Sequence, residues 1–464
     1  MKKIKIGYLP FFLEMYDAED QHYRDPLVDY MNTLIRKIES CGIEVVLPDD
    51  ICRVKNEFSK AAELFNSEGV DAVVTQHLAY SPSLESIDAL SSLKAPIVVF
   101  DTTPDYGILR EADSRVLMRA NHGIHGVQDM CSMLTRRGIR YWLCVGHAEQ
   151  KTTWEDLVSA CRAAAMSMAF KRARIGSVAG SFEGMGDFSV SDERISSTLG
   201  ARIVRMDAET ASAIAGEVSE SEIDEELLYE RQYFNVVAAN ENAMRNQARW
   251  GLALRKWVDR EHLSAVSVNF QSLTDGGFKA MPFVECSRML SRGIGYAGEG
   301  DILTAGLIGA IDSVYSDTTF AEMFCPDWEK DLVFISHMGE MNPALAQWKP
   351  SIVDCPMSGK SGNDTVYVIG CAKPGKAVYV NLAPLREGFR LILSDIVLTG
   401  DGKQGNAYDN YRNQGWFRPA KPVSDFLREF SMLGGTHHSA VVYGGDISTL
   451  KLFGEMMNFD VKII

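Results

Sequence analysis

Short apolar runs alternate with amphipathic stretches along the first third of the chain. Strand-like apolar runs lie at 3–10, 44–48, 72–76, 96–101 and 141–146. Helix-like patterns, with apolar residues three and four positions apart, lie at 26–40, 61–66, 128–136 and 153–170. This rhythm is typical of βαβ units around a parallel sheet. Because the run 141–146 is continuously apolar, we predict a strand there that is buried on both faces.

The rest of the chain repeats this rhythm once and then changes character. Strand-like runs at 174–180, 202–207 and 264–270 flank a helical pattern at 219–261. Beyond about Tyr315, strand-like runs joined by Gly, Asp and Pro turns dominate, with few helical patterns before 447–458. Such strand-rich sequence is typical of an antiparallel sheet or barrel.

These patterns predict the fold class and the domains. We expect an α/β protein with two tandem Rossmann-like α/β domains, 1–172 and 173–315. A β-rich, barrel-like C-terminal domain follows at 316–464. The length of 464 residues is ample for three such domains.

Composition and charge remove several classes of protein. Hydrophobic residues make up 46% and charged residues 23%, which is ordinary globular composition and excludes a disordered or fibrous protein. The net charge of −15 repels a phosphate backbone, so we expect no nucleic acid partner. No run of 18 apolar residues occurs, so we expect no membrane span. Nine cysteines without a Cys-x-x-Cys pair, and a start that reads as a strand, favour a cytoplasmic location.

The stretch 293–298, GIGYAG, matches the G-x-G-x-x-G pattern of dinucleotide-binding loops. That pattern must follow a strand, whereas the residues before it read as helical. The carboxylates of Glu299 and Asp301 follow and would repel a phosphate. We interpret the stretch as a glycine-rich turn that presents Glu299 into a cleft. A helix N-cap with an acidic first turn is the alternative explanation of Glu299 and Asp301.

Three further positions carry candidate chemistry. Glu322 lies among apolar and aromatic residues, where a carboxylate is costly unless it is paired or binds a metal; a surface position is the alternative. His337 ends the apolar run 332–335, where a structural histidine is the alternative. His437 and His438 open a strand-like run, whose alternation would point them to opposite faces. We therefore expect only one of the two to face a given cavity.

Two carboxylates and two imidazoles near element ends suggest a site for a divalent metal of borderline hardness such as Mn²⁺. A zinc hydrolase is not favoured, because the sequence has no H-E-x-x-H helix and no cysteine ligand motif. A serine hydrolase is not favoured either, because no G-x-S-x-G occurs.

At these motifs the sequence resembles the L-arabinose isomerase family. The resemblance is carried by GYAGEGD at 295–301, TTFAEMF at 318–324, SHM with a following Glu and Asn-Pro at 336–343, and GGTHHS at 434–439. It spans most of the chain and is strongest from about Asn269 onward. It implies two Rossmann-like domains followed by a β-rich domain, in agreement with the fold predicted from the patterns.

The resemblance also implies roles for single residues. The implied metal ligands are Glu299, Glu322, His337 and His438, and the two glutamates are also the implied catalytic acid and base. The implied substrate contacts are Met185, Phe270, His125 and His437. The implied cofactor is Mn²⁺, with Co²⁺ or Mg²⁺ as alternatives. The implied assembly is a homo-oligomer, a trimer or hexamer, with active sites at subunit interfaces.

The implied reaction is a metal-dependent aldose–ketose isomerisation of a small sugar, L-arabinose to L-ribulose, through a cis-enediol. A metal that chelates the two substrate oxygens would stabilise the charge that develops on them, while the two glutamates move protons.

The sequence departs from the family pattern where the sugar would be contacted. Family members usually carry a Gly-Ser-Gln loop after the first strand, but this loop reads YLPFFLEMYD and has no glutamine there. Ile302 replaces an aromatic residue, and His122 stands where glutamine is common. L-fucose, D-arabinose and D-galactose therefore stay open as substrates.

A non-catalytic sugar-binding protein or sugar-responsive regulator is the alternative from another class. Tandem Rossmann-like lobes also enclose sugars in such proteins. This alternative gives no purpose to the four candidate metal ligands, and we expect the enzyme.

Overall fold

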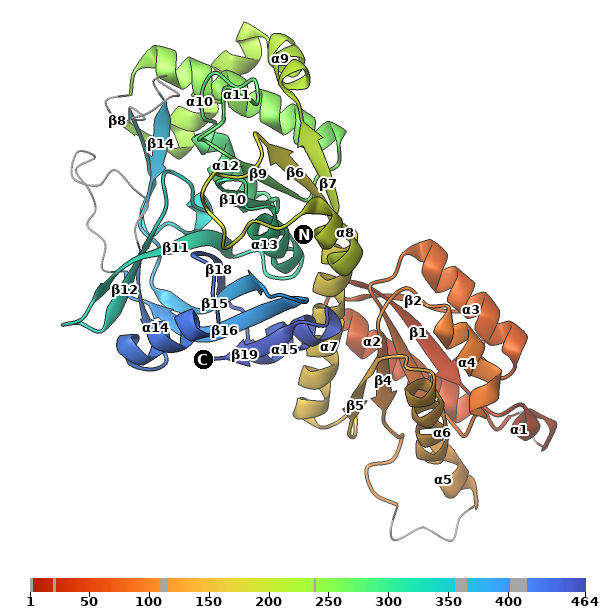
Figure 1. Cartoon of the computed structure of the whole chain (residues 1–464). Helices are drawn as coiled ribbons and strands as arrows, with labels where there is room; N and C mark the ends of the chain where they lie inside the picture. The colour runs from red at the N-terminus through yellow and green to blue at the C-terminus, as the bar shows by residue number, and fades with distance from the viewer. Residues whose placement is uncertain (1–2, 20–21, 109–114, 238, 355–364, 401–414) are drawn as a thin grey trace. The chain divides into compact units, whose positions relative to one another are not determined.

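The computed structural model describes residues 3–19, 22–108, 115–237, 239–354, 365–400 and 415–464 (Figure 1). The chain divides into two compact units, Lys2–Met168 and Ala169–Ile464. The boundary falls within a single helix, α7 (Lys151–Lys171). The division of the second unit at 315/316 stays a prediction. No helix in the described ranges is long and apolar enough to cross a membrane.

The first unit is built around a parallel five-stranded sheet. In sheet order its strands are β2 (Glu44–Val46), β1 (Lys5–Phe11), β3 (Ala72–His77), β4 (Ile97–Asp101) and β5 (Tyr141–Val145). Its helices before α7 are α1 (Glu14–Glu19), α2 (Asp25–Ser40), α3 (Lys55–Glu68), α4 (Ser83–Ser91), α5 (Arg115–Ala120) and α6 (Gly123–Arg136). Apolar side chains of α3, α4 and α6 pack on one sheet face and form its core. The predicted βαβ rhythm is confirmed.

The prediction that strand β5 is buried on both faces is wrong. Among the described residues β5 pairs with β4 alone, so it is an edge strand. Leu143 is 48% exposed and Val145 is 56% exposed. A continuous apolar run indicates a strand, but it does not indicate whether the strand lies at the centre or at the edge of its sheet.

The second unit begins with a parallel four-stranded sheet. In sheet order its strands are β10 (Gly295–Gly298), β9 (Ala265–Val268), β6 (Arg174–Val178) and β7 (Arg202–Met206). Its helices are α8 (Asp192–Leu199), α9 (Ala208–Gly216), α10 (Glu220–Tyr233), α11 (Glu241–Arg260), α12 (Phe283–Ser291) and α13 (Ile302–Asp312).

The long helical stretch predicted at 219–261 is two helices, α10 and α11. Between them β8 (Asn235–Val237) joins a small sheet with β13 (Ser351–Asp354) and β14 (Val366–Ile369). Asn240 caps α11 with its side chain, which marks the new helix start.

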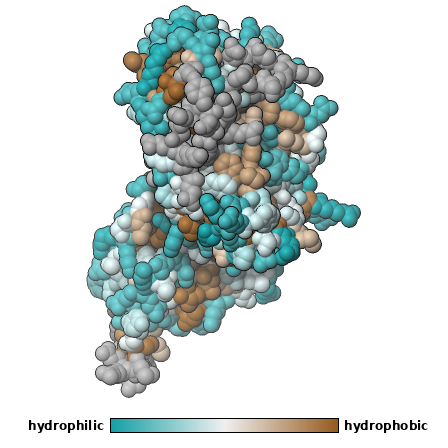
Figure 2. Space-filling view, turned by 90° about the vertical axis from the view of Figure 1, so that its left-hand side faces the viewer, coloured by the Kyte–Doolittle hydropathy of each residue, from teal (hydrophilic) through white to brown (hydrophobic). Residues whose placement is uncertain are grey.

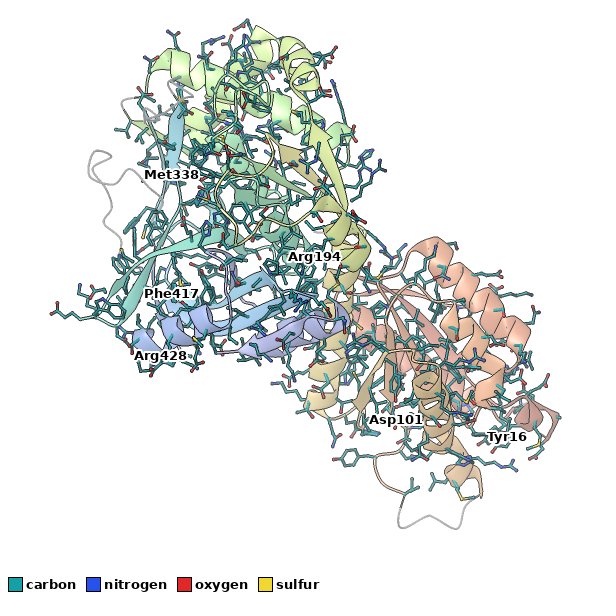
Figure 3. The ribbon with its side chains drawn as sticks, in the orientation of Figure 1. Tyr16, Asp101, Arg194, Met338, Phe417 and Arg428 are labelled. Carbon is teal, nitrogen blue, oxygen red and sulfur yellow. The ribbon has the colours of Figure 1, made fainter. Side chains whose placement is uncertain are left out.

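The remainder of the second unit is a closed barrel. Six strands follow one another around it: β15 (Gly375–Pro384), β18 (His438–Tyr443), β11 (Thr318–Asp327), β12 (Leu332–Ser336), β17 (Gly415–Pro419) and β16 (Phe389–Leu398). Pairing of β15 with β16 closes the barrel, and β19 (Asp460–Ile463) adds to β16. Helices α14 (Val423–Met432) and α15 (Ile447–Met456) accompany it, and α14 was not predicted. Phe417, labelled in Figure 3, lies fully buried in its core.

The predicted fold class is confirmed: two parallel-sheet, Rossmann-like regions precede a β-rich, barrel-like C-terminal region. The parallel sheet of the second unit and the barrel together position the candidate site, because its residues come from strand ends of both.

Candidate active site

Three of the predicted ligands converge in the second unit. One ligand atom from each of Glu299, His337 and His438 lies within 4.8 Å of the others, and all three residues are buried. Glu299 follows β10, His337 follows β12, and His438 is the first residue of β18. The site therefore joins one parallel strand end to two barrel strands.

Backbone geometry brings Glu299 into the site. Its φ is +64°, followed by +82° at Gly300, so the chain turns sharply after β10. The Glu299 backbone N–H donates to Val268, and its carbonyl accepts from Phe182 N–H. The prediction that 293–298 is a glycine-rich turn is wrong, because 295–298 is a buried strand and the turn comes after it. The strained residue is Glu299 itself, held by its neighbours on both sides.

His337 is fixed by a carboxylate behind it. Its Nδ1 lies 2.7 Å from Glu340 Oε2, and the Tyr296 hydroxyl donates to Glu340 Oε1 at 2.9 Å. The side chains of His337 and Glu340 are 2% and 1% exposed. The imidazole also lies directly against Gly298, where a Cβ atom would come within 2.6 Å of the His337 ring.

His438 is fixed in the same way. Its Nδ1 lies 3.1 Å from Asp301 Oδ2, while Asp301 Oδ1 accepts from Thr304 N–H and caps α13. The helix-cap explanation of Asp301 is therefore correct, and the same carboxylate also holds a histidine. The His438 ring stacks on Phe188 at 5.0 Å and meets the edge of Phe320 at 4.8 Å.

His437 and His438 both face Glu299, so the expectation that only one could face the site is wrong. Their Nε2 atoms lie 3.6 and 3.3 Å from Glu299 Oε2. Pleat alternation does not apply, because β18 begins at His438 and His437 precedes it. Asp187 holds His437: its Oδ2 lies 2.6 Å from Nδ1 and accepts from the His437 backbone N–H.

Glu322 lies beside this group rather than within it. It stands on β11 directly opposite His438 and Ser336 of the two neighbouring strands. Directly opposite residues of an antiparallel pair share a sheet face. Burial raises the pKa of Glu322, and attraction to the imidazoles of His337 and His438 partly offsets this.

The site holds an excess of negative charge, and three of its four carboxylates are buried. Its carboxylates are Glu299, Asp301, Glu322 and Glu340, and among the described residues none of them pairs with a lysine or arginine. Burial opposes ionisation of Glu299, but its interactions with His437 and His438 outweigh burial and hold its pKa at about 2. Burial lowers the pKa of His438, yet interactions with Asp301 and Glu299 raise it to about 9. The raised pKa values of His437 and His438 let these two imidazoles offset part of the negative charge.

The donor set fits a divalent metal. The Nε2 atoms of His337 and His438 are buried and make no well-oriented hydrogen bond among the described residues, and His438 Nε2 lies 3.3 Å from Glu299 Oε2. Both rings hold Nδ1 on a carboxylate, which leaves Nε2 as the free ligand atom beside Glu299. One carboxylate and two imidazoles suit borderline cations such as Mn²⁺ and Co²⁺.

The structure also places the predicted substrate contacts. The Phe270 ring meets Phe182 edge-on at 5.4 Å, and Phe182 bonds the backbone of Glu299. Met185 lies in the same loop as Phe182 and Asp187. His125 belongs to the other compact unit, on α6, where it stacks on Tyr80 at 4.5 Å. Their contacts with substrate stay predictions.

Sequence reasoning gave no role to four residues that shape the site: Asp187, Phe188, Tyr296 and Glu340. Glu340 stands three positions after His337, a spacing that allows a local carboxylate–imidazole contact in a tight turn. Asp187 gave no signal, because it meets His437 from 250 positions away.

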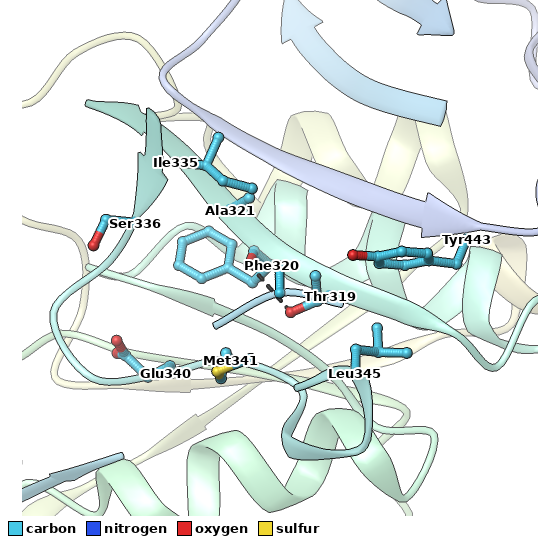
Figure 4. A pocket seen from close by; sticks show the side chains of 10 residues that line it. Thr319, Phe320, Ala321, Ile335, Ser336, Glu340, Met341, Leu345 and Tyr443 are labelled. Carbon is cyan, nitrogen blue, oxygen red and sulfur yellow. Dashed lines mark hydrogen bonds between the residues drawn. The ribbon is translucent and has the colours of Figure 1, made fainter. Parts of the chain in front are cut away.

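A cavity lies behind the site. Its volume is about 30 Å³, and Figure 4 shows the side chains that line it, Phe320 and Glu340 among them. The Phe320 ring also meets His337 edge-on at 4.7 Å. Glu340 thus has largely apolar neighbours on this side and no cationic partner there among the described residues.

Two models of known protein families match residues of the second unit. A family model described as the L-arabinose isomerase central domain matches residues 193–317. A second, described as the L-arabinose isomerase C-terminal domain, matches residues 317–460. Together they include Glu299, Glu322, His337 and His438.

Individual relatives align over most of the chain. An L-arabinose isomerase from Geobacillus kaustophilus (strain HTA426) is 25% identical over 90% of this chain and 85% of that protein. One from Aeromonas salmonicida (strain A449) is 24% identical over 100% of this chain and 95% of that protein.

Among solved structures, a periplasmic solute binding protein from Actinobacillus succinogenes 130z with bound D-allose is 11% identical. The structural alignment covers 67% of this chain and 92% of the binding protein, and its TM-score is 0.18. A likeness this slight carries no argument.

Proposed function

The chain belongs to the L-arabinose isomerase family, and on that premise we propose that it is a divalent-metal-dependent aldose–ketose isomerase. We propose L-arabinose as the first substrate to test, because the relatives that align over most of the chain carry that name. The observation that supports a metal best is the pair of buried Nε2 atoms of His337 and His438, which make no well-oriented hydrogen bond among the described residues and lie beside Glu299.

Glu299, His337 and His438 would hold the metal, with Glu322 as the fourth ligand from the adjacent strand. A divalent ion there supplies Lewis-acid stabilisation of the negative charge that develops on the substrate oxygens. The donor set favours Mn²⁺, with Co²⁺ and Mg²⁺ as alternatives.

The chain's own residues would move the protons. Two imidazoles hold Glu299 ionised, so it has no proton to donate and would act as the proton acceptor, with a basicity that its low pKa keeps small. Glu322 is half-buried and its pKa is raised, so it is suited to carry a proton. Isomerisation needs a proton moved between C2 and C1 and another between the two oxygens, which two carboxylates can share.

Proton NMR of a panel of aldoses in D₂O, with purified protein and Mn²⁺, tests this proposal. We expect deuterium at C2 of the aldose and ketose signals, first with L-arabinose and otherwise with L-fucose, D-arabinose or D-galactose. Activity should disappear with chelator and return with Mn²⁺. Full activity in the chelator would contradict metal dependence, and Glu299→Gln or Glu322→Gln variants that keep a tenth of the activity would contradict the acid–base assignment.

We also propose a homo-oligomer. The exposed apolar edge strand β5 supports this, because its backbone groups and the side chains of Leu143 and Val145 lack a covering element among the described residues. Figure 2 shows that hydrophobic residues also gather in patches on one face of the molecule. Eight described cysteines are free, which supports the proposed cytoplasmic location.

A further inference from the structure

Each candidate histidine ligand rests on a buried carboxylate that is not itself a candidate metal ligand. Glu340 lies 2.7 Å from His337 Nδ1, and Asp301 lies 3.1 Å from His438 Nδ1. We propose that Glu340 and Asp301 are positioning residues that hold both imidazoles with Nε2 toward Glu299, and that Tyr296 in turn holds Glu340. This inference rests on the proposed metal-dependent function.

Glu340 is placed where a carboxylate is costly. It is 1% exposed, and no lysine or arginine pairs with it among the described residues. A buried carboxylate without compensation is strongly unfavourable. The Nδ1–H of His337 and the hydroxyl of Tyr296 are its hydrogen-bond donors, so its stabilisation depends on the imidazole and on what the imidazole binds.

The two carboxylates determine which ring nitrogen is free. A carboxylate at Nδ1 favours the tautomer with the proton on Nδ1, so the lone pair is on Nε2. In both histidines Nε2 is the atom that makes no well-oriented hydrogen bond among the described residues. A carboxylate thus lies at Nδ1 of both histidines, although they come from separate strands. Such an arrangement keeps both Nε2 atoms ready to bind a metal before the metal arrives.

Tyr296 holds the carboxylate behind His337, and no corresponding phenol bonds Asp301 among the described residues. It is fully buried on β10, three residues before Glu299, and donates to Glu340 Oε1 at 2.9 Å. The strand that delivers Glu299 therefore also orients the carboxylate behind His337. Asp301 has no such phenol, but capping of α13 fixes its other oxygen at 2.9 Å from Thr304 N.

The test is Mn²⁺ binding, measured by calorimetric titration of the full chain and by electron paramagnetic resonance of the bound ion. The variants are Glu340→Gln, Asp301→Asn and Tyr296→Phe. Asparagine is as good an N-cap as aspartate, so Asp301→Asn removes the charge and keeps the helix cap. We expect a 10- to 100-fold weaker Mn²⁺ affinity for the first two variants and about a fivefold weaker affinity for Tyr296→Phe.

Two matched controls carry the same substitutions elsewhere. Glu230→Gln changes a carboxylate that is also 1% exposed, and Tyr8→Phe removes a buried hydroxyl in the other unit that bonds Gln76. Both controls should bind Mn²⁺ as the original protein does. Wild-type affinity in Glu340→Gln and Asp301→Asn would overturn the positioning role while leaving the proposed function intact.

Failure of the original protein to bind Mn²⁺, Co²⁺ or Mg²⁺ would overturn the proposed metal dependence together with this inference. Thermal unfolding of each variant identifies any that fails to fold. If Glu340→Gln does not fold, Asp301→Asn and Tyr296→Phe decide the result.

Discussion

The position of His337 depends on the missing side chain at Gly298. A Cβ atom there would come 2.6 Å from His337 Cε1 and 3.2 Å from Nε2, closer than packed atoms allow. We predict that Gly298→Ala displaces the imidazole and lowers both Mn²⁺ affinity and turnover more than tenfold. Gly216→Ala is the control, because a Cβ atom at Gly216 would meet no other atom within 4 Å. Equal Mn²⁺ affinity in both variants would contradict this account of Gly298.

Glu230 gives a pH-dependent stability that is independent of the site. Burial raises its pKa to about 8, although the hydrogen bond from Gln247 opposes this. The folded protein therefore keeps this proton between about pH 4.3, where an unfolded glutamate loses it, and pH 8. The stabilising contribution is full below the unfolded pKa and is lost as the pH rises through 8.

We predict that Glu230→Gln removes this pH dependence, because glutamine stays neutral and can still pair with Gln247. The melting temperature of the original protein should fall relative to the variant as the pH rises from 5 to 9. Glu225→Gln, at an exposed position of the same helix, is the control. Parallel melting curves for the original protein and Glu230→Gln across this range would disprove the prediction.

At this scale the sequence predicted motif residues better than their partners. Glu299, His337 and His438 stand in short motifs whose chemistry can be recognised along the chain. Asp187 and Tyr296 act through contacts made by folding, over 250 and 44 positions. No local pattern encodes such distances, so these residues needed the structure.

At the scale of elements, the loop between β6 and α8 connects the parallel sheet to the barrel side of the site. Phe182 bonds the Glu299 carbonyl, and Asp187 bonds both the side chain and the backbone of His437. Asp187 touches no candidate metal ligand in these contacts. Asp187 therefore orients His437 without contacting a metal ligand, whereas Phe182 and Phe188 of the same loop contact Glu299 and His438.

We predict that Asp187→Asn lowers kcat/KM by about 10-fold, the value of one charge-assisted hydrogen bond. Asparagine can still accept from the His437 backbone N–H, so the loop should stay in place. Mn²⁺ affinity should not change, which separates this variant from Asp301→Asn. A large loss of Mn²⁺ affinity would show that the loop supports the ligands themselves.

The sequence predicted well which segments form helices and strands, because hydrophobic periodicity indicates this. It predicted poorly where a strand lies within its sheet and at which residue the strand begins. The helix predicted at 26–40 is α2 (Asp25–Ser40), and the strand-like runs of the first third are all strands. The edge position of β5 and the start of β18 at His438 were missed. Sheet order and the exact first residue of a strand depend on tertiary pairing, which hydrophobic periodicity does not contain.

At the scale of the whole molecule, we propose that the edge strand β5 is a contact between copies of the chain. Its sequence, YWLCV, is as apolar as a central strand, yet Leu143 and Val145 are about half exposed. An exposed apolar edge is a template for pairing with a second chain. A second copy is the natural occupant because the same strand on both copies can pair across a two-fold axis.

We predict that the original protein is an oligomer by light scattering coupled to size exclusion, and that Leu143→Lys with Val145→Glu shifts it toward the monomer. Charges on an edge strand oppose edge-to-edge pairing and need no change inside the first unit. Leu228→Lys on α10, where the side chain is 69% exposed, is the control and should leave the mass unchanged. A monomeric original protein would remove β5 from the account of assembly. If the double variant keeps the oligomeric mass of the original protein, the contact lies on another surface. If the double variant is monomeric, Mn²⁺ titration of it shows whether one chain alone binds the metal.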